Sequence, residues 1–473
     1  MEHDQDMQHH MRQMREEHAQ LLWVHFAAML IGLWLLTSPA ILGSLDPSNV
    51  GVRAVAVMHE RHLAPIELRQ QWLAWSDMAS GALIVAFAGL SLLWRHRWAQ
   101  WGTCAVGLWL LAAPLVFWAP SASVYANDTL AGALAIAFSI LVPMMPGMDM
   151  KAMMAREDIP PGWDYSPSSW SQRLPIIALA FVAFFIARYL AAYQLGHVPQ
   201  VWDPSFGDGT RVIITSDVSK AWPVADAGLG ALSYLLEALS GMMGGRQRWR
   251  TMPWMVAMFG VLVIPLGSVS IFFIIIQPIM IGTWCTLCLV SAAAMVAMLP
   301  YAFDEVVAMF QFLVRARAEG NPLWPLFWHG GTVQGARVDG SPPLSITAAQ
   351  WRRLVAQADA LPKALIVSAA IGAWLMFTRV VFGHDGAMAD SVHLVGSLVF
   401  TFSICAFAEV ARPLRAVNLL FGAWLLASPW LLDGATLSGT AGVMLAGAAL
   451  IALALPRGPV EHRYGGWDRA LLW

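Results

Sequence analysis

The residues best suited to chemistry are two cysteines three positions apart, Cys285 and Cys288. On a helix this spacing places both thiols on one face, where they can close a small disulfide ring. They stand at the start of an apolar segment, and the unpaired amide groups and positive dipole end of a helix N-terminus stabilise a thiolate. The pair therefore indicates thiol–disulfide redox chemistry.

The other candidates for thiol or metal chemistry are weaker. Cys104 and Cys405 stand alone inside apolar segments, where a cysteine packs as a small apolar residue. A structural zinc site needs about four ligands, and no second Cys-x-x-Cys or histidine pair accompanies Cys285 and Cys288. We therefore expect no metal site.

The elements that carry the pair are membrane helices. The 473 residues are 58% hydrophobic and 12% charged, whereas soluble domains carry about 25% charged residues. The sequence has no basic tract interleaved with aromatic residues, so we do not expect nucleic-acid binding. The first apolar segment lacks a signal-peptide cleavage pattern, so we expect it to remain as an anchor in the lipid bilayer. Apolar stretches long enough to cross a membrane number about twelve: 21–43, 72–94, 99–119, 127–146, 173–194, 226–244, 253–275, 281–302, 364–383, 390–411, 416–432 and 438–456.

The distribution of positive charge predicts the orientation of these spans. If the N-terminus is cytoplasmic, the loops and tails on its side carry 21 Lys and Arg, and those on the opposite side carry five. Cytoplasmic loops are the positive ones, so both termini are predicted to be cytoplasmic. In a bacterial inner membrane, Cys285 and Cys288 then lie at the periplasmic face, where disulfide exchange is common.

A repeated pattern surrounds the cysteine-bearing region. A Gly-x-Trp motif recurs in four apolar segments, and each is followed by a second segment with a small-residue motif, so the sequence predicts four helical hairpins. The four motifs are Gly32-Leu33-Trp34 with Pro39, Gly107-Leu108-Trp109 with Pro114, Gly422-Ala423-Trp424 with Pro429, and Gly372-Ala373-Trp374 with Arg379 in place of Pro. We expect Arg379 to extend to the membrane interface.

The hairpins resemble the SPW-repeat family of bacterial membrane proteins over residues 21–146 and 364–456. The resemblance is specific in pattern and implies little about function. Close helix packing through small residues is the physical role that the pattern favours. We therefore interpret these hairpins as scaffold.

The segment between the hairpins resembles a second family. Its order of elements, its glycines near Tyr234 and its stretch Gly282 to Cys288 are similar to the vitamin K epoxide reductase family. The resemblance covers about 173–302. It implies a four-helix-bundle membrane enzyme that binds a quinone, of the ubiquinone or menaquinone type and without a covalent bond, next to the Cys-x-x-Cys.

The resemblance also implies roles for individual residues. Cys288 takes the place of the cysteine nearer the quinone, and Cys285 that of the cysteine that exchanges with incoming thiols. Ser216, or alternatively Ser219, takes the place of a serine that hydrogen-bonds toward the quinone, and Tyr234 lies among the matching residues of the bundle. Trp284 and Trp222 either wall an apolar pocket or lie at the membrane interface as tryptophans commonly do.

Two acids also lie in the predicted bundle. Asp226 either accepts a proton during quinone reduction or pairs with Arg188, whereas we expect a structural role for Glu237.

One departure from the family bears on function. Members usually carry a further cysteine pair in the outer loop, but the loop from Val201 to Asp226 has none, and Thr210 stands near one of those positions. The leading hypothesis is a quinone-dependent thiol–disulfide oxidoreductase whose electron donor, a periplasmic thiol protein or a small thiol, comes from outside the chain. The alternative is a non-catalytic scaffold or redox sensor that retains the bundle.

The predicted fold is all-α and polytopic, with a central four-helix bundle flanked by hairpin repeats. The parts in order are a cytoplasmic tail (1–20), two hairpins (21–146), a cytoplasmic linker (147–172), the four-helix bundle (173–302), a second linker (303–363), two further hairpins (364–456) and a cytoplasmic tail (457–473).

Overall fold

The computed structural model is helical, and it describes residues 15–16, 18–46, 48–141, 152, 155–340 and 362–472. In that part of the chain no β-strand forms; two isolated bridges join Ile159 to Arg337 and Trp163 to Tyr464. The predicted all-α membrane fold is confirmed. Residues 1–14, 142–151 and 341–361 lie outside the description; they belong to the predicted N-terminal tail, the end of the second hairpin (142–146) and the two linkers.

Nine helices of the described residues are long and apolar enough to cross a membrane. Each of the twelve predicted segments contains a helix, but α5, α17 and α11 have only 14 to 17 residues, so twelve membrane crossings remain a prediction. The nine are α2 (Leu22–Ile41), α4 (Ile66–Ser91), α6 (Ala122–Leu141), α8 (Trp170–Gln194), α13 with its final turn (Pro253–Ile281), α14 (Thr286–Ala318), α19 (Gly386–Cys405), η3 with α20 (Glu409–Leu431) and α21 (Leu437–Ala454).

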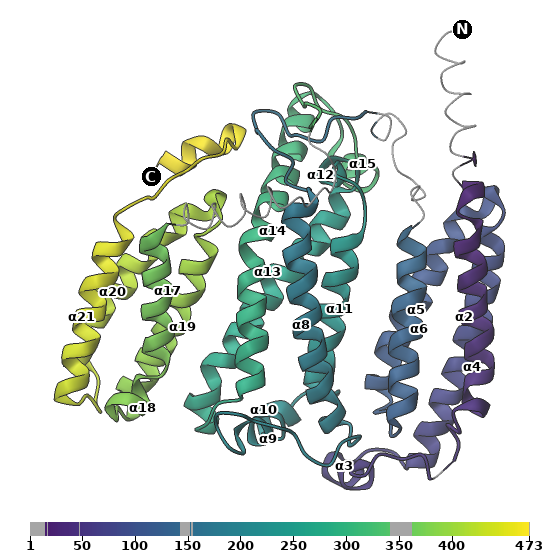
Figure 1. The fold of residues 1–473 in the computed structure, drawn as a ribbon, viewed down its shortest axis with the longest axis horizontal. Coiled ribbons are helices and arrows are strands. Elements are labelled where there is room, and N and C mark those ends of the chain that lie inside the picture. Colours follow the sequence, from purple (N-terminus) through teal and green to yellow (C-terminus); the bar gives the residue numbers. More distant parts are fainter. Residues whose placement is uncertain are drawn as a thin grey trace, which may run out of the picture. The chain divides into compact units, whose positions relative to one another are not determined.

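The chain divides into two compact units, and the division falls inside α8; Figure 1 labels the helices. Unit 1 holds residues 1–148 and 184–244. It contains α2, α4, α6 and the C-terminal part of α8, together with α3 (Ala54–Arg61), α5 (Gln100–Val116), α9 (Gly209–Ile214), α10 (Asp217–Lys220) and α11 (Asp226–Met242). Unit 2 holds residues 149–183 and 245–473, with α12 (Arg248–Thr251), α13 to α15 (Leu323–His329), α17 (Lys363–Met376), α18 (Thr378–Phe382) and α19 to α21.

Each hairpin is held by two glycines that face one another. A Cβ atom added to Gly32 would lie 2.7 Å from the carbonyl oxygen of Gly81, and one added to Gly107 would lie 2.9 Å from that of Gly132. The C-terminal hairpins repeat the contact between Gly372 and Gly396 and between Gly422 and Gly447. Since no side chain fits at these crossings, the small-residue motifs of the sequence are explained by direct backbone contact.

The repeated tryptophans join one hairpin of a pair to the other. In unit 1 the indole N–H of Trp34 donates to Asn127 at 2.7 Å, and that of Trp109 donates to Ser76 at 2.9 Å. In unit 2 Trp424 donates to Ser391 at 2.9 Å. Each acceptor lies five positions before the crossing glycine of the other hairpin, so the three bonds occupy equivalent places.

In unit 2, a group of polar and charged side chains surrounds the C-terminal half of α14. Glu305 and Arg248 form an ion pair that is almost completely buried, and Tyr165 donates to Asp304. Trp163 and Phe312 belong to the apolar cluster beside it. Residues 303–318, placed in a linker by the sequence, are therefore helical, because α14 has an apolar face that this cluster buries.

Candidate functional site

The cysteine pair of unit 2 follows an irregular turn. Helix α13 ends at Ile276, a wider helical turn covers Gln277–Ile281, and the chain then bends through Gly282 and Thr283 to Cys285, the residue before α14. Gly282 has a φ of +81°, a left-handed conformation that residues with a side chain rarely adopt. Pro278 stands at the beginning of the wider turn and fixes its own φ. We refer to residues 277–288 as the cysteine turn.

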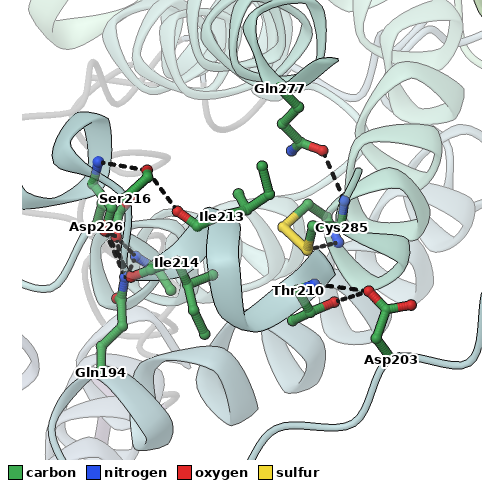
Figure 2. The surroundings of a disulfide bond; sticks show 12 residues. Gln194, Asp203, Thr210, Ile213, Ile214, Ser216, Asp226, Gln277 and Cys285 are labelled. Carbon is green, nitrogen blue, oxygen red and sulfur yellow. Dashed lines mark hydrogen bonds between the residues drawn. A yellow bond between two sulfur atoms is a disulfide. The ribbon is translucent and has the colours of Figure 1, made fainter. Parts of the chain in front are cut away.

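Cys285 and Cys288 form a disulfide, with their Cα atoms 5.2 Å apart. Cys285 is the N-cap of α14, and its Sγ accepts the backbone N–H of Cys288 at 3.0 Å. The backbone N–H of Cys285 donates to the side-chain oxygen of Gln277 at 3.0 Å (Figure 2). Gln277 is itself buried. The bond from Gln277 therefore fixes the start of the helix that carries both sulfurs.

The two cysteines differ in access. Cys285 is completely buried, whereas Cys288 is partly exposed. Cys288 packs against an apolar cluster that contains Ile274, Ala292 and Met376. An attacking group or an apolar acceptor therefore reaches Cys288 more readily than Cys285, although the family resemblance assigns exchange with incoming thiols to Cys285.

Trp284 lies within unit 2 beside the pair. Its side chain is 7% exposed, and its ring lies 5.7 Å from that of Phe377 and 6.2 Å from that of His393. Both neighbours belong to the C-terminal hairpins. The tryptophan is thus packed inside the unit beside the cysteine turn.

The two candidate serines lie in unit 1, Ser216 just before α10 and Ser219 within it. Ser216 is its N-cap and donates to the carbonyl oxygen of Ile213 at 2.7 Å. Ser219 is buried, and its hydroxyl lies 2.9 Å from both Asp226 and Gln194. Ser216 is the more accessible of the two, while Ser219 belongs to a closed polar cluster.

Asp226 belongs to the same cluster. It accepts hydrogen bonds from Gln194, from Ser219 and from the backbone N–H of Ala227 (Figure 2). Arg188, the partner considered for Asp226, instead has its guanidinium 5.7 Å from the ring of Tyr125. Asp226 therefore organises the entrance to α11.

The remaining predicted residues of unit 1 are dispersed. Tyr234 is 7% exposed on α11, and Trp222 is 40% exposed after α10, with its carbonyl oxygen 3.5 Å from Arg61. Thr210, at the position considered for a family cysteine, is buried and donates to Asp203 at 2.6 Å. Glu237 is completely buried, and neither of its carboxyl oxygens accepts a hydrogen bond from the described residues.

Sequence reasoning gave no role at the cysteine turn to three residues of unit 2 that lie in it or beside it. Gln277 binds the amide of Cys285, Arg379 donates to the carbonyl oxygen of Pro278 at 3.0 Å, and a ring nitrogen of His393 lies 3.2 Å from the carbonyl oxygen of Ile274. Arg379 also donates to Asp390, and its position at the membrane interface stays a prediction. The signal that could have found it is its place in the repeat, where the other hairpins have proline.

Two segments of the chain match known protein families, and one of them contains the cysteine pair. Residues 174–303 match the vitamin K epoxide reductase family. Residues 364–456 match the SPW repeat domain. The vitamin K epoxide reductase resemblance is confirmed, and the SPW-repeat resemblance is confirmed over 364–456, whereas its extension to 21–146 stays a prediction. No curated protein and no solved structure matches the chain. The chain is thus a membrane protein with a segment that matches the vitamin K epoxide reductase family, and that segment contains the Cys285–Cys288 disulfide.

Proposed function

We propose that the protein is a bacterial inner-membrane oxidoreductase that passes electrons from periplasmic thiols to a quinone through Cys285 and Cys288. The observation that carries this proposal is the disulfide at the N-terminus of α14, with one buried and one accessible sulfur, inside the segment that matches the family. The charge asymmetry of the loops supports a periplasmic position for the pair and cytoplasmic positions for both termini.

The thiol half of the reaction is an exchange between disulfides. A donor thiolate attacks one sulfur of the Cys285–Cys288 disulfide, a mixed disulfide forms, and the other cysteine leaves as a thiolate. The donor's second thiol then attacks the mixed disulfide, so the donor departs oxidised and the pair holds two electrons and two protons. Since the loop 201–226 contains no cysteine, the donor is a separate thiol protein or a small thiol.

The second half returns the pair to the disulfide. A bound quinone supplies the acceptor for two electrons and two protons. The surroundings of Cys288 fit such a group, because the partly buried Leu289 and Phe377 pack with it against the buried Ile274 and make these surroundings apolar. Trp284 would wall this apolar region, and the family resemblance would give Ser216 a hydrogen bond toward the quinone.

The buried position of Cys285 places a requirement on exchange at that sulfur. Its side chain has no exposed surface, so a thiol reaches it only when the segment between Gly282 and Cys285 moves. Cys288 needs no such motion. A donor thiol should therefore form its mixed disulfide at Cys288, and exchange at Cys285 should require opening of the turn.

The test uses the full chain in lipid with dithiothreitol and a short-chain ubiquinone, and follows the quinone absorbance. Cys285→Ser and Cys288→Ser should each lower turnover at least 100-fold, because either change removes the disulfide. Cys405→Ser, which changes a buried cysteine far along the sequence, is the control and should retain turnover. Unchanged turnover in Cys285→Ser would sink the proposal.

A non-catalytic role is the second candidate. The buried sulfur of Cys285 and the absence of loop cysteines favour a structural or sensing disulfide. Rapid alkylation of whole cells treated with a membrane-permeant reductant separates the two functions. A pair that cycles is reduced and labelled, whereas a structural pair remains oxidised in excess reductant.

A further inference from the structure

One hairpin of the four departs from the repeat at three positions. Counted from the crossing glycines, the α17–α19 hairpin has an aromatic residue, a cation and an imidazole where the other three have smaller or uncharged residues. Phe377 corresponds to Thr37, Ala112 and Ala427; Arg379 corresponds to Pro39, Pro114 and Pro429; His393 corresponds to Met78, Thr129 and Met444.

All three departures contact the chain that leads to Cys285. Arg379 donates to the carbonyl oxygen of Pro278 at 3.0 Å, and a ring nitrogen of His393 lies 3.2 Å from the carbonyl oxygen of Ile274. The ring of Phe377 packs on Trp284, the residue before Cys285, at 5.7 Å. Three independent changes to one repeat thus meet the same short stretch, 274–284.

The contacts are anchored on the side of the hairpin. The guanidinium of Arg379 also pairs with Asp390 of α19 at 3.1 Å, which holds the arginine in place. The other ring nitrogen of His393 lies 3.0 Å from the carbonyl oxygen of Met376, and the histidine is 3% exposed. A neutral imidazole can donate to one of its two carbonyls, and an imidazolium can donate to both. His393 therefore bridges the hairpin and α13 at a site closed to water.

We propose that the α17–α19 hairpin is a clamp that positions the cysteine turn, with Arg379 and His393 as positioning residues for thiol–disulfide exchange at Cys285 and Cys288. This inference rests on the proposed function and assigns the SPW-type hairpin a role, which is to position the cysteine turn. The clamp acts on the dithiol state, because it holds the start of α14 in place when the bond between the sulfurs is absent. The two thiols then stay close, and closeness favours the disulfide.

The expected direction follows from the exchange reaction. When the dithiol of Cys285 and Cys288 reacts with oxidised dithiothreitol, one disulfide forms in the protein and one is reduced in the reagent, so electrons and protons balance. Loosening the turn lowers the effective concentration of one thiol at the other. We expect the equilibrium constant for oxidation to fall about tenfold, which is about 30 mV for this two-electron couple.

The experiment restores the repeat residue at each departure. The full chain in detergent is equilibrated with mixtures of reduced and oxidised dithiothreitol from both directions, and the fraction of reduced pair is read by alkylation and mass spectrometry. His393→Met and Arg379→Pro should each shift the midpoint about tenfold toward reduction. Arg379→Lys keeps a hydrogen-bond donor for the carbonyl oxygen of Pro278, so its midpoint should lie close to that of the wild type.

A matched control separates positioning from general weakening of the hairpin. Ser391→Ala removes the hydrogen bond from Trp424 within the same hairpin pair and does not touch the cysteine turn. It should lower thermal stability and leave the midpoint unchanged. Wild-type midpoints in both His393→Met and Arg379→Pro overturn the clamp, as does an equal shift in Ser391→Ala. If Arg379→Pro does not fold, His393→Met decides.

This titration contains no quinone, so it can succeed where the proposed function fails. A protein that shows the shifted midpoints but reduces no quinone keeps the clamp and loses the proposed activity. A protein that reduces quinone with unshifted midpoints loses the clamp alone.

Discussion

The N-terminal hairpin pair of unit 1 and the C-terminal hairpin pair of unit 2 share one packing design and differ in where they carry polar groups. In both, glycines cross in backbone contact and a tryptophan bonds across to the neighbouring hairpin. At the position four residues before the crossing glycine, the N-terminal pair has Asp77 and Asp128, and the C-terminal pair has Val392 and Val443. The repeat thus keeps its crossing glycines and its tryptophan and differs at this position.

The buried acids set the N-terminal pair apart. Asp77 and Asp128 are 1% and 0% exposed. Neither carboxyl oxygen of Asp77 accepts a hydrogen bond in the described part of the chain. Two buried carboxyl groups without cations cost stability, whereas the valines at the same places add apolar packing. In the C-terminal pair, the polar residues Arg379 and His393 instead bond backbone carbonyl groups outside the hairpin.

The largest effect is expected at a crossing glycine. In Gly81→Ala the new Cβ would lie 2.5 Å from the carbonyl oxygen of Gly32 and 2.9 Å from the backbone nitrogen of Leu36, so the two helices must separate. We expect a loss of about 3 kcal/mol or more, measured by unfolding of the detergent-solubilised protein. Gly89→Ala in the same helix meets no atom within 4 Å and should be neutral or stabilising by less than about 1 kcal/mol. Equal losses in both variants would contradict the packing account.

An intermediate effect is expected when the two pairs exchange residues. Val392→Asp introduces a carboxyl into a fully apolar environment and should destabilise by about 2 to 4 kcal/mol. Asp77→Val makes the reverse change in unit 1 and should be neutral or stabilising by about 1 kcal/mol. Both are compared in the same unfolding assay. A marked loss of stability in Asp77→Val would show that the N-terminal pair depends on its carboxyl groups and would break the comparison.

The smallest effect is expected at the tryptophans that join the hairpins. Trp109→Phe and Trp424→Phe each remove one indole hydrogen bond, to Ser76 and to Ser391, and keep most of the ring. Each should cost about 1 kcal/mol, and the two losses should agree because the bonds are equivalent. Trp75→Phe changes a tryptophan that is 69% exposed and is the control. Different losses at Trp109 and Trp424 would mean that the two pairs use the motif differently.

Local sequence patterns predicted much of this structure. The apolar stretches located a helix in each of twelve segments, because length and apolar composition are properties of the segment itself. The Gly-x-Trp motif predicted four hairpins, and the crossings at Gly32 and Gly422 give the physical reason. The spacing of Cys285 and Cys288 was enough to predict that they can form a disulfide, since the two cysteines are three positions apart, about one helix turn.

Contacts between segments far apart in the chain could not be predicted from the sequence. The bond from His393 to the carbonyl oxygen of Ile274 joins residues 119 positions apart, and no local pattern encodes such a pairing. The sequence also left Ser216 and Ser219 undecided, because one turn of a short helix separates them; the structure shows Ser219 committed to Asp226. The roles of both serines toward a quinone remain predictions.

The length of α14 has a consequence for the membrane in which the protein works. At 1.5 Å per residue, the stretch from Thr286 to Glu305 is about 29 Å long, close to the thickness of a hydrocarbon core. Its first end is fixed by the cysteine turn, and its second by the buried ion pair with Arg248. This stretch therefore matches one bilayer thickness. In a thinner membrane it must tilt, and the disulfide at its end tilts with it.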